Sequence, residues 1–207
     1  MSGAFHPWAA AVALALVLAG VWWLATVDRL VRTGVAGAGW RAAALAPVDP
    51  LRSGLRLLFK EARPTEVPDR ALWRGAPVLL VGLVLAALAV MPLAPDLIGA
   101  DLSVGVVYLT AMFALVMVAV FAAGWGPNSK DPLSAGYRFI GLMLAYEMPF
   151  AITIIAVALP AESLALGDIV AAQKAILWNV VLQPMGFLIY LVCALAVAFW
   201  GPFEVIS

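Results

Sequence analysis

Long stretches without a charged residue are the feature that most constrains this sequence. Four stretches contain no Asp, Glu, Lys or Arg, and a fifth contains one acidic residue: 1–27, 75–95, 102–129, 175–203 and, with only Glu147, 139–161. A helix needs about 20 apolar residues to cross the hydrocarbon core of a bilayer. The spacing therefore predicts five transmembrane helices, near 7–27, 75–95, 104–123, 138–160 and 176–200. We expect an all-α integral membrane protein in which residues 1–207 form a single membrane domain.

The composition excludes several classes of protein. Hydrophobic residues make up 65% of the chain, compared with roughly 45–50% in a soluble domain, so a soluble globule is excluded. The 12 basic and 12 acidic residues cancel, which argues against a nucleic-acid partner. A single cysteine, Cys193, and a single histidine, His6, rule out an internal disulfide and argue against a Cys/His metal site. We expect this chain to hold no metal and no redox cofactor itself.

The basic residues predict which way the helices run. Nine of the twelve Lys and Arg residues lie between Arg29 and Arg74, and Lys130 and Arg138 flank the loop after the third span. Short loops rich in Lys and Arg stay on the cytoplasmic side of a membrane. We therefore expect the N-terminus outside and the C-terminus in the cytoplasm. Because nothing basic precedes the first apolar stretch, we expect that stretch to be a retained anchor rather than a signal peptide.

The first inner loop, 28–74, is long enough to contain a helix. Asp49-Pro50 resembles an N-cap followed by proline at the first helical position, which predicts a helix over 50–63. Its basic residues recur every three or four positions, at Arg52, Arg56, Lys60 and Arg63, and its apolar residues form another face, at Leu51, Leu55, Leu58 and Ala62. Such a helix lies in the membrane surface. The pattern alone leaves open whether it only anchors the loop or also binds a ligand.

Glu147 is the ionisable residue nearest the centre of the apolar stretch 139–161. A charged carboxylate at that depth costs about 2.5–3.5 kcal/mol, so it should face the helix bundle or a water-filled cavity. Tyr146 precedes it and Pro149 follows, which indicates a locally loosened helix. Two interpretations remain open: a proton relay, or a neutral acid that joins two helices by a hydrogen bond.

Three strings resemble a known family: Gly124-Trp-Gly-Pro-Asn-Ser-Lys130, Gly136-Tyr-Arg138 and Ala145-Tyr-Glu-Met-Pro149. They are similar to the quinone-site membrane subunit of respiratory complex I, known as the H subunit. Weaker matches follow in the same order, at Leu57-Leu-Phe-Lys-Glu61, Ala76-Pro77, Gln183-Pro184 and Pro202-Phe203-Glu204. The resemblance covers roughly 28–204. Members of this family have eight spans, of which five have counterparts here.

The resemblance implies roles for particular residues. The end of the surface helix would line a quinone entrance through Leu55, Arg56, Leu58, Phe59, Lys60 and Glu61. Glu147 would relay protons, and the inner loops would couple quinone reduction to ion pumping through Asn128, Lys130, Arg138 and Glu204. Quinone would be the substrate. Iron–sulfur clusters and FMN would be held by partner subunits, since members of this family bind neither NADH nor iron themselves.

The resemblance also implies partners and a location. The partners would be the hydrophilic quinone-site and iron–sulfur subunits, small and antiporter-like membrane subunits, and membrane lipid. The location would be the bacterial inner membrane. Two other classes of function stay open on the sequence: the membrane subunit of an energy-converting hydrogenase or formate hydrogenlyase, and an unrelated five-span transporter or scaffold.

Overall fold

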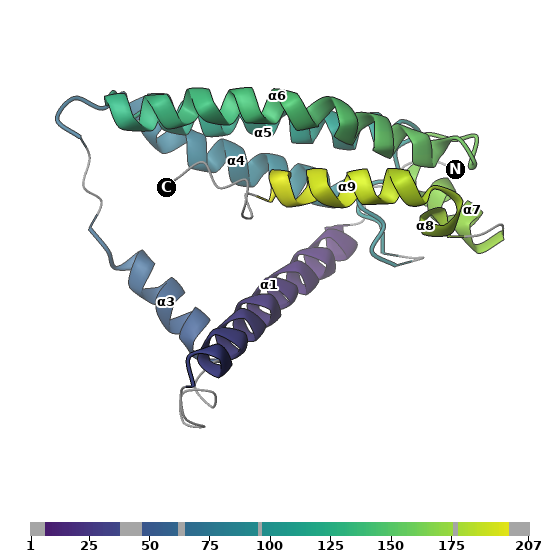
Figure 1. The fold of residues 1–207 in the computed structure, drawn as a ribbon, viewed down its shortest axis with the longest axis horizontal. Helices are drawn as coiled ribbons and strands as arrows, with labels where there is room; N and C mark the ends of the chain where they lie inside the picture. Colours follow the sequence, from purple (N-terminus) through teal and green to yellow (C-terminus); the bar gives the residue numbers. More distant parts are fainter. Residues whose placement is uncertain (1–6, 38–46, 62–64, 95–96, 176–177, 199–207) are drawn as a thin grey trace. The chain divides into compact units, whose positions relative to one another are not determined.

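A computed structural model describes residues 7–37, 47–61, 65–94, 97–175 and 178–198. Regular structure in these ranges is helical, with no β-strand and one isolated β-bridge between Ala94 and Leu97. The helices are α1 (Pro7–Val35), α3 (Asp49–Leu58), α4 (Arg70–Val90), α5 (Gly105–Trp125), α6 (Lys130–Ala158), α7 (Leu166–Ala175), α8 (Asn179–Leu182) and α9 (Pro184–Val197) (Figure 1).

Four of these helices are long and apolar enough to cross a membrane: Ala11–Val35 within α1, and the whole of α4, α5 and α6. The shortest of them has 21 residues, which at 1.5 Å per residue is about 31 Å. A fifth apolar helix, α9, has 14 residues and reaches only about 21 Å. The prediction of an all-α membrane protein is therefore confirmed.

The helices extend beyond the predicted spans wherever charged residues can continue a helical turn. Helix α6 begins at Lys130, eight residues before the predicted span, and α1 continues through Asp28 and Arg32, which form an i,i+4 ion pair of 2.8 Å. Helix α4 begins at Arg70 because the Asp69 carboxylate accepts the backbone N–H groups of Ala71 and Leu72. A charge-free window marks the hydrocarbon-compatible part of a helix, whereas caps determine its ends.

The fifth predicted span is broken in two at Gln183. Pro184 has no N–H group and starts a new helix, so α8 ends one residue before Gln183. The Gln183 side-chain amide donates to the backbone carbonyl of Ala156, 3.0 Å away on α6. That carbonyl would bond the N–H of residue 160 in a continuous helix, but residue 160 is a proline. The Leu159 N–H also bonds this carbonyl, at 3.3 Å, so Gln183 supplies a second donor in place of the N–H that Pro160 lacks.

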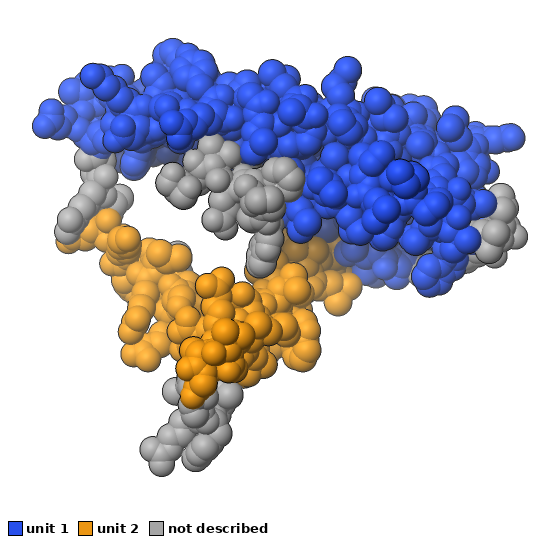
Figure 2. Space-filling model, in the orientation of Figure 1, with its two compact units in different colours: residues 1–10, 64–207 blue, residues 11–63 orange. Residues whose placement is uncertain are grey.

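The chain divides into two compact units, residues 11–63 and residues 1–10 with 64–207 (Figure 2). In the larger unit α4 packs on α5, α5 on α6, and α6 on α9. Helix α6 is central to its core, and the buried side chains are Leu83, Val116, Ala119, Phe139, Met143, Tyr146, Phe150, Cys193 and Ala196. Edge-to-face contact of Phe113 with Phe150, at 5.3 Å, and stacking of Phe150 on Tyr190, at 5.7 Å, add to this packing. The smaller unit contains α3 and most of α1.

Candidate functional site

Helix α3 lies within the predicted range but ends at Leu58, so the predicted helix over 50–63 is too long. The Lys60 N–H bonds the carbonyl of Leu57, three residues back, which is the tighter turn that commonly closes a helix. Phe59, Lys60 and Glu61 therefore follow the helix instead of continuing its face. Arg63 lies outside the described residues.

The candidate quinone-entrance residues are exposed wherever the structure describes their side chains. Leu55 is 57% exposed and Phe59 is 87% exposed, and Arg56, Lys60 and Glu61 are also exposed. The Leu58 side chain lies outside the described part of the structure. Since large apolar side chains rarely stay in water as a group, this helix presents a surface suited to lipid or to another apolar molecule.

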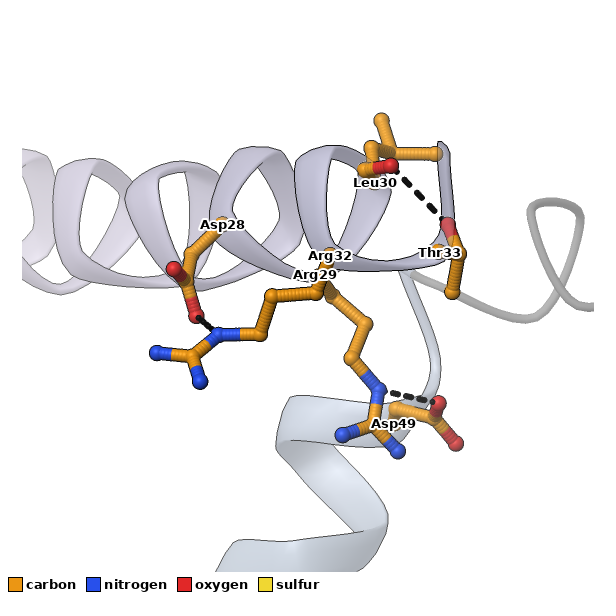
Figure 3. A network of polar contacts seen from close by, with 6 residues as sticks. All are labelled: Asp28, Arg29, Leu30, Arg32, Thr33 and Asp49. Atoms are coloured by element: carbon orange, nitrogen blue, oxygen red, sulfur yellow. Dashed lines mark hydrogen bonds and ion pairs between the residues drawn. The ribbon is translucent and has the colours of Figure 1, made fainter. Parts of the chain in front are cut away.

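Asp49 does not cap α3, contrary to the sequence prediction. The helix begins at Asp49 itself, and Val48 occupies the cap position without a side-chain hydrogen bond. The Asp49 carboxylate instead accepts a hydrogen bond from Nε of Arg29, 3.0 Å away on α1 (Figure 3). The Trp22 indole also donates to the carbonyl of Pro47, at 3.0 Å. Within the smaller unit, these two bonds join the start of α3 to α1.

Glu147 is half-buried on α6 and lines a cavity of about 250 Å³ between α5 and α6. Most of the lining is apolar, from Val107, Ala111, Phe113, Ala114, Met143, Phe150, Ala151 and Val197. The polar lining residues are Thr110, Tyr146 and Glu147. Thr110 Oγ1 donates to backbone carbonyls of its own helix, and the Tyr146 hydroxyl is buried without a hydrogen-bond partner in the described part of the chain. Glu147 thus lines a cavity, which is one of the two environments expected for a carboxylate at this depth.

Helix α6 continues through the segment around Glu147, where the sequence predicts a loosened backbone. Pro149 lies inside α6, and its ring nitrogen cannot donate to the carbonyl of Ala145. The Ala145 carbonyl, two residues before Glu147, therefore lacks the usual i+4 donor.

The inner-loop residues lie apart from Glu147. Lys130 and Arg138 are exposed on α6, 17 and 9 residues before Glu147, which corresponds to about 26 and 14 Å along the helix. Asn128 lies in the turn before α6 and donates from Nδ2 to the carbonyl of Val67, at 3.3 Å. Glu204 lies outside the described residues. Lys130 and Arg138 therefore lie apart from Glu147 along α6 and are not part of the cavity lining.

Sequence reasoning missed the residues that Asn128 and its neighbours contact. The segment 65–69 pairs with 126–128 through Thr65, Val67 and Asp69. One signal was available, because Asp69 directly before an apolar run is a typical N-cap. The pairing itself joins residues about 60 positions apart, and no local pattern predicts it. Among the described residues, no group of three or more His, Cys, Asp and Glu side chains could hold a metal ion.

Comparison with known proteins identifies relatives of this chain. The H subunit of the NADH-quinone oxidoreductase of Anoxybacillus flavithermus is 39% identical over 150 residues, which cover 72% of this chain and 45% of the relative. The second H subunit of Cereibacter sphaeroides is 38% identical over the same length, covering 72% and 47%. The Brevibacillus brevis H subunit is 34% identical over 206 residues, covering 95% and 59%. The chain spans about half the length of the curated relatives it matches.

A family model described as NADH dehydrogenase matches nearly the whole chain, residues 8–207. The match confirms the resemblance carried by Gly124–Lys130 and Ala145–Pro149. The apolar helices of this chain and its similarity to membrane subunits together show that it is a multi-pass membrane protein. It belongs to the NADH dehydrogenase family whose members include the H subunit of NADH-quinone oxidoreductase, respiratory complex I.

Proposed function

We propose that this chain is a membrane subunit of a proton-translocating NADH:quinone oxidoreductase. The family match over residues 8–207, with relatives named as H subunits of that enzyme, carries the proposal. In this assignment the chain forms the quinone entrance and transmits the energy of quinone reduction to the pumping part of the membrane arm. Its partners are the hydrophilic quinone-site and iron–sulfur subunits, together with small and antiporter-like membrane subunits.

The exposed end of α3 supports the quinone-entrance role. Leu51 and Leu55 on α3, and Phe59 directly after it, are each more than half exposed, and Arg52 and Arg56 lie on the same helix. An isoprenoid tail can bury against the apolar side chains, while the guanidinium groups attract anionic lipid headgroups or acidic partner residues. Entry along such a surface lets a quinone leave the bilayer without exposing its tail to water.

The cavity at Glu147 supports the coupling role. The lining around the Glu147 carboxyl is largely apolar, so a charge that appears nearby is weakly screened from it. Reduction of a quinone to a quinol takes up two protons and two electrons, so charge near the quinone chamber changes with each turnover. Glu147 would respond to that change by binding or releasing a proton.

The redox cofactors belong to other subunits in this proposal. Electrons reach the quinone from FMN and iron–sulfur clusters in the hydrophilic partners, and this chain supplies the apolar path and the titratable group. Loops rich in Lys and Arg face the cytoplasm, which places the N-terminus outside and the C-terminus inside.

Mass spectrometry of the assembly tests the proposal. The chain carries an affinity tag and is purified from its own membranes in mild detergent. Co-purification with an NADH-oxidising flavoprotein and iron–sulfur subunits is the expected result. A nickel–iron hydrogenase in their place would assign the chain to an energy-converting hydrogenase, and the absence of both would leave a transporter or scaffold.

A further inference from the structure

Three hydrogen bonds attach the segment before α4 to the turn between α5 and α6. The Thr65 hydroxyl donates to the carbonyl of Pro127, and the Asn128 amide donates to the carbonyl of Val67 at 3.3 Å. The backbone N–H of Asp69 donates to the carbonyl of Gly126 at 2.9 Å. The bonds fall on alternate residues of 65–69, so one edge of this segment faces the turn. We call residues 65–69 and 126–128 together the latch.

The turn has a shape that few residues can adopt. Asn128 has a φ of 51°, in the left-handed region that asparagine tolerates better than most side chains. A Cβ at Gly126 would lie 2.8 Å from the backbone nitrogen of Trp73, so only glycine allows α4 this close. The Asn128 N–H bonds the carbonyl of Trp125 at 2.9 Å, which closes the turn. The turn is thus stabilised by a hydrogen bond of its own as well as by its three hydrogen bonds with residues 65–69.

We infer that Asn128 is a positioning residue that anchors the connection between α3 and α4. Asn128 has no titratable group and lies 19 positions before Glu147, so its chemistry suits anchoring better than proton transfer. The connection from Phe59 to Thr65 contains six peptide units and reaches at most about 22 Å. Fixing Thr65 to the turn limits where Phe59, Lys60 and Glu61 can lie. This inference rests on the proposed function, because it is the quinone entrance that the latch would position.

Asparagine is suited to this task for two separate reasons. Its backbone accepts the left-handed conformation, and its Nδ2 group provides the donor for Val67. Asn128→Gly keeps the first property and removes the second, whereas Asn128→Asp replaces the donor by an oxygen that repels the carbonyl. Thr65→Val breaks a different bond of the same latch with little change of shape. Ser129→Ala is the matched control, because Ser129 makes no side-chain hydrogen bond as the cap of α6.

The test uses the assembled complex and two measurements. Hydrogen exchange at the Asp69 amide reports whether the latch has opened, and we expect it to speed up about two- to tenfold in Asn128→Asp, Asn128→Gly and Thr65→Val. Steady-state kinetics with decylubiquinone measures how readily quinone reaches its site through the proposed entrance. We expect KM to rise at least about twofold in the same variants while kcat per assembled complex stays unchanged. Ser129→Ala should change neither measurement.

A purely structural latch would lower the amount of assembled complex but leave KM unchanged, and that result would overturn the inference. Variants of α3 itself show whether only the role of Asn128 is wrong or the quinone-entrance proposal is wrong as well. If Leu55→Asp impairs quinone reduction while the latch variants leave KM unchanged, only the role of Asn128 is wrong. If Leu55→Asp has no effect either, the quinone-entrance proposal is wrong. Should Asn128→Asp fail to assemble, Thr65→Val decides, because it alters no backbone conformation.

Discussion

Arg29 on α1 and Asp49 in the first turn of α3 form a hydrogen-bonded ion pair, with 3.0 Å between Nε and Oδ2. The two residues are 20 positions apart, and the pair links the helix that crosses the membrane to the helix with the exposed apolar face. The Arg29 side chain is 53% exposed and that of Asp49 is 29% exposed, so solvent screens the attraction. Such a pair contributes at most about 1 kcal/mol.

The first prediction concerns this pair. Arg29→Gln and Asp49→Asn should each modestly increase the rate of hydrogen exchange in the first turn of α3. The double variant should exchange no faster than the faster of the two single variants. Exchange of both charges, Arg29→Asp with Asp49→Arg, should recover only part of the protection, because an arginine in the first helical turn opposes the helix dipole. Raising the salt concentration to about 1 M should reduce the difference between variant and parent. Additive effects of the two single variants would show that the pair makes no energetic contribution.

The second prediction concerns Gln183, whose amide bonds the carbonyl of Ala156. Gln183→Leu leaves that carbonyl with only the Leu159 N–H as a donor and should lower the free energy of unfolding by about 0.5–1.5 kcal/mol. Adding Pro160→Ala provides a backbone N–H four residues after Ala156, so the double variant should regain much of the loss. Thermal denaturation in detergent measures both. No recovery in the double variant would contradict the explanation that Gln183 compensates for Pro160.

The contacts of Gln183 show where sequence reasoning ends. Pro160 and Pro184 were visible in the sequence, yet a continuous apolar run predicted one unbroken span over 176–200, since hydropathy does not report a missing N–H group. The four long apolar helices were predictable because each depends only on a local run of residues. The start of α3 was predictable for the same reason, through Pro50. The end of α3, however, depends on a backbone hydrogen bond from the Lys60 N–H to the Leu57 carbonyl, which no local sequence pattern predicts.

Long-range pairing limited the prediction of the candidate site in the same way. Glu147 could be selected from the sequence, because one carboxylate in an apolar stretch is costly unless it faces a cavity. Asn128 could be selected only through a family resemblance, and its contact with Val67 spans 61 residues. Asp49 illustrates the reverse case. Its local pattern predicted a helix cap, but its carboxylate instead accepts a hydrogen bond from Arg29 on another helix.

The third prediction concerns topology. After Cys193→Ala removes the single cysteine, new cysteines can be placed at exposed sites: Glu66→Cys, Asp131→Cys and Glu162→Cys. With Lys- and Arg-rich loops inside, a membrane-impermeant maleimide should label position 162 in intact cells. Positions 66 and 131 should react only after the membrane is permeabilised. Labelling of position 66 from outside would reverse the proposed orientation.

The fourth prediction concerns the apolar face of α3. Leu55→Asp should reduce NADH:quinone activity, while NADH oxidation with a hydrophilic artificial acceptor persists because that electron path avoids the membrane subunit. Adding Leu58→Asp should deepen the loss. Leu57→Asp is the matched control: Leu57 is similarly exposed, at 68%, but points about 200° away from Leu55 round the helix. Equal loss of both activities would indicate failed assembly, and unchanged quinone reduction would mean that α3 only anchors the loop.

The fifth prediction concerns Glu147 and decides between its two interpretations. Glu147→Gln keeps the shape and a hydrogen-bonding amide but removes the titratable group. If Glu147 relays protons, the complex should assemble and oxidise NADH while the number of protons pumped per electron pair falls. Reconstitution into vesicles with a pH-sensitive dye measures this ratio. Asn128→Gly is a useful companion, because a positioning residue should change the KM for quinone and leave the ratio unchanged.

A structural role for Glu147 predicts the opposite pattern across two variants. An amide can replace a neutral acid in a hydrogen bond between helices at small cost, so Glu147→Gln would pump normally. Glu147→Leu would leave the partner group unpaired and lower the free energy of unfolding by about 1–3 kcal/mol. Because the cavity at Glu147 is mostly apolar and the nearby Tyr146 hydroxyl lacks a partner in the described part of the chain, we expect the relay pattern: the Leu variant should assemble, and both variants should lose coupling.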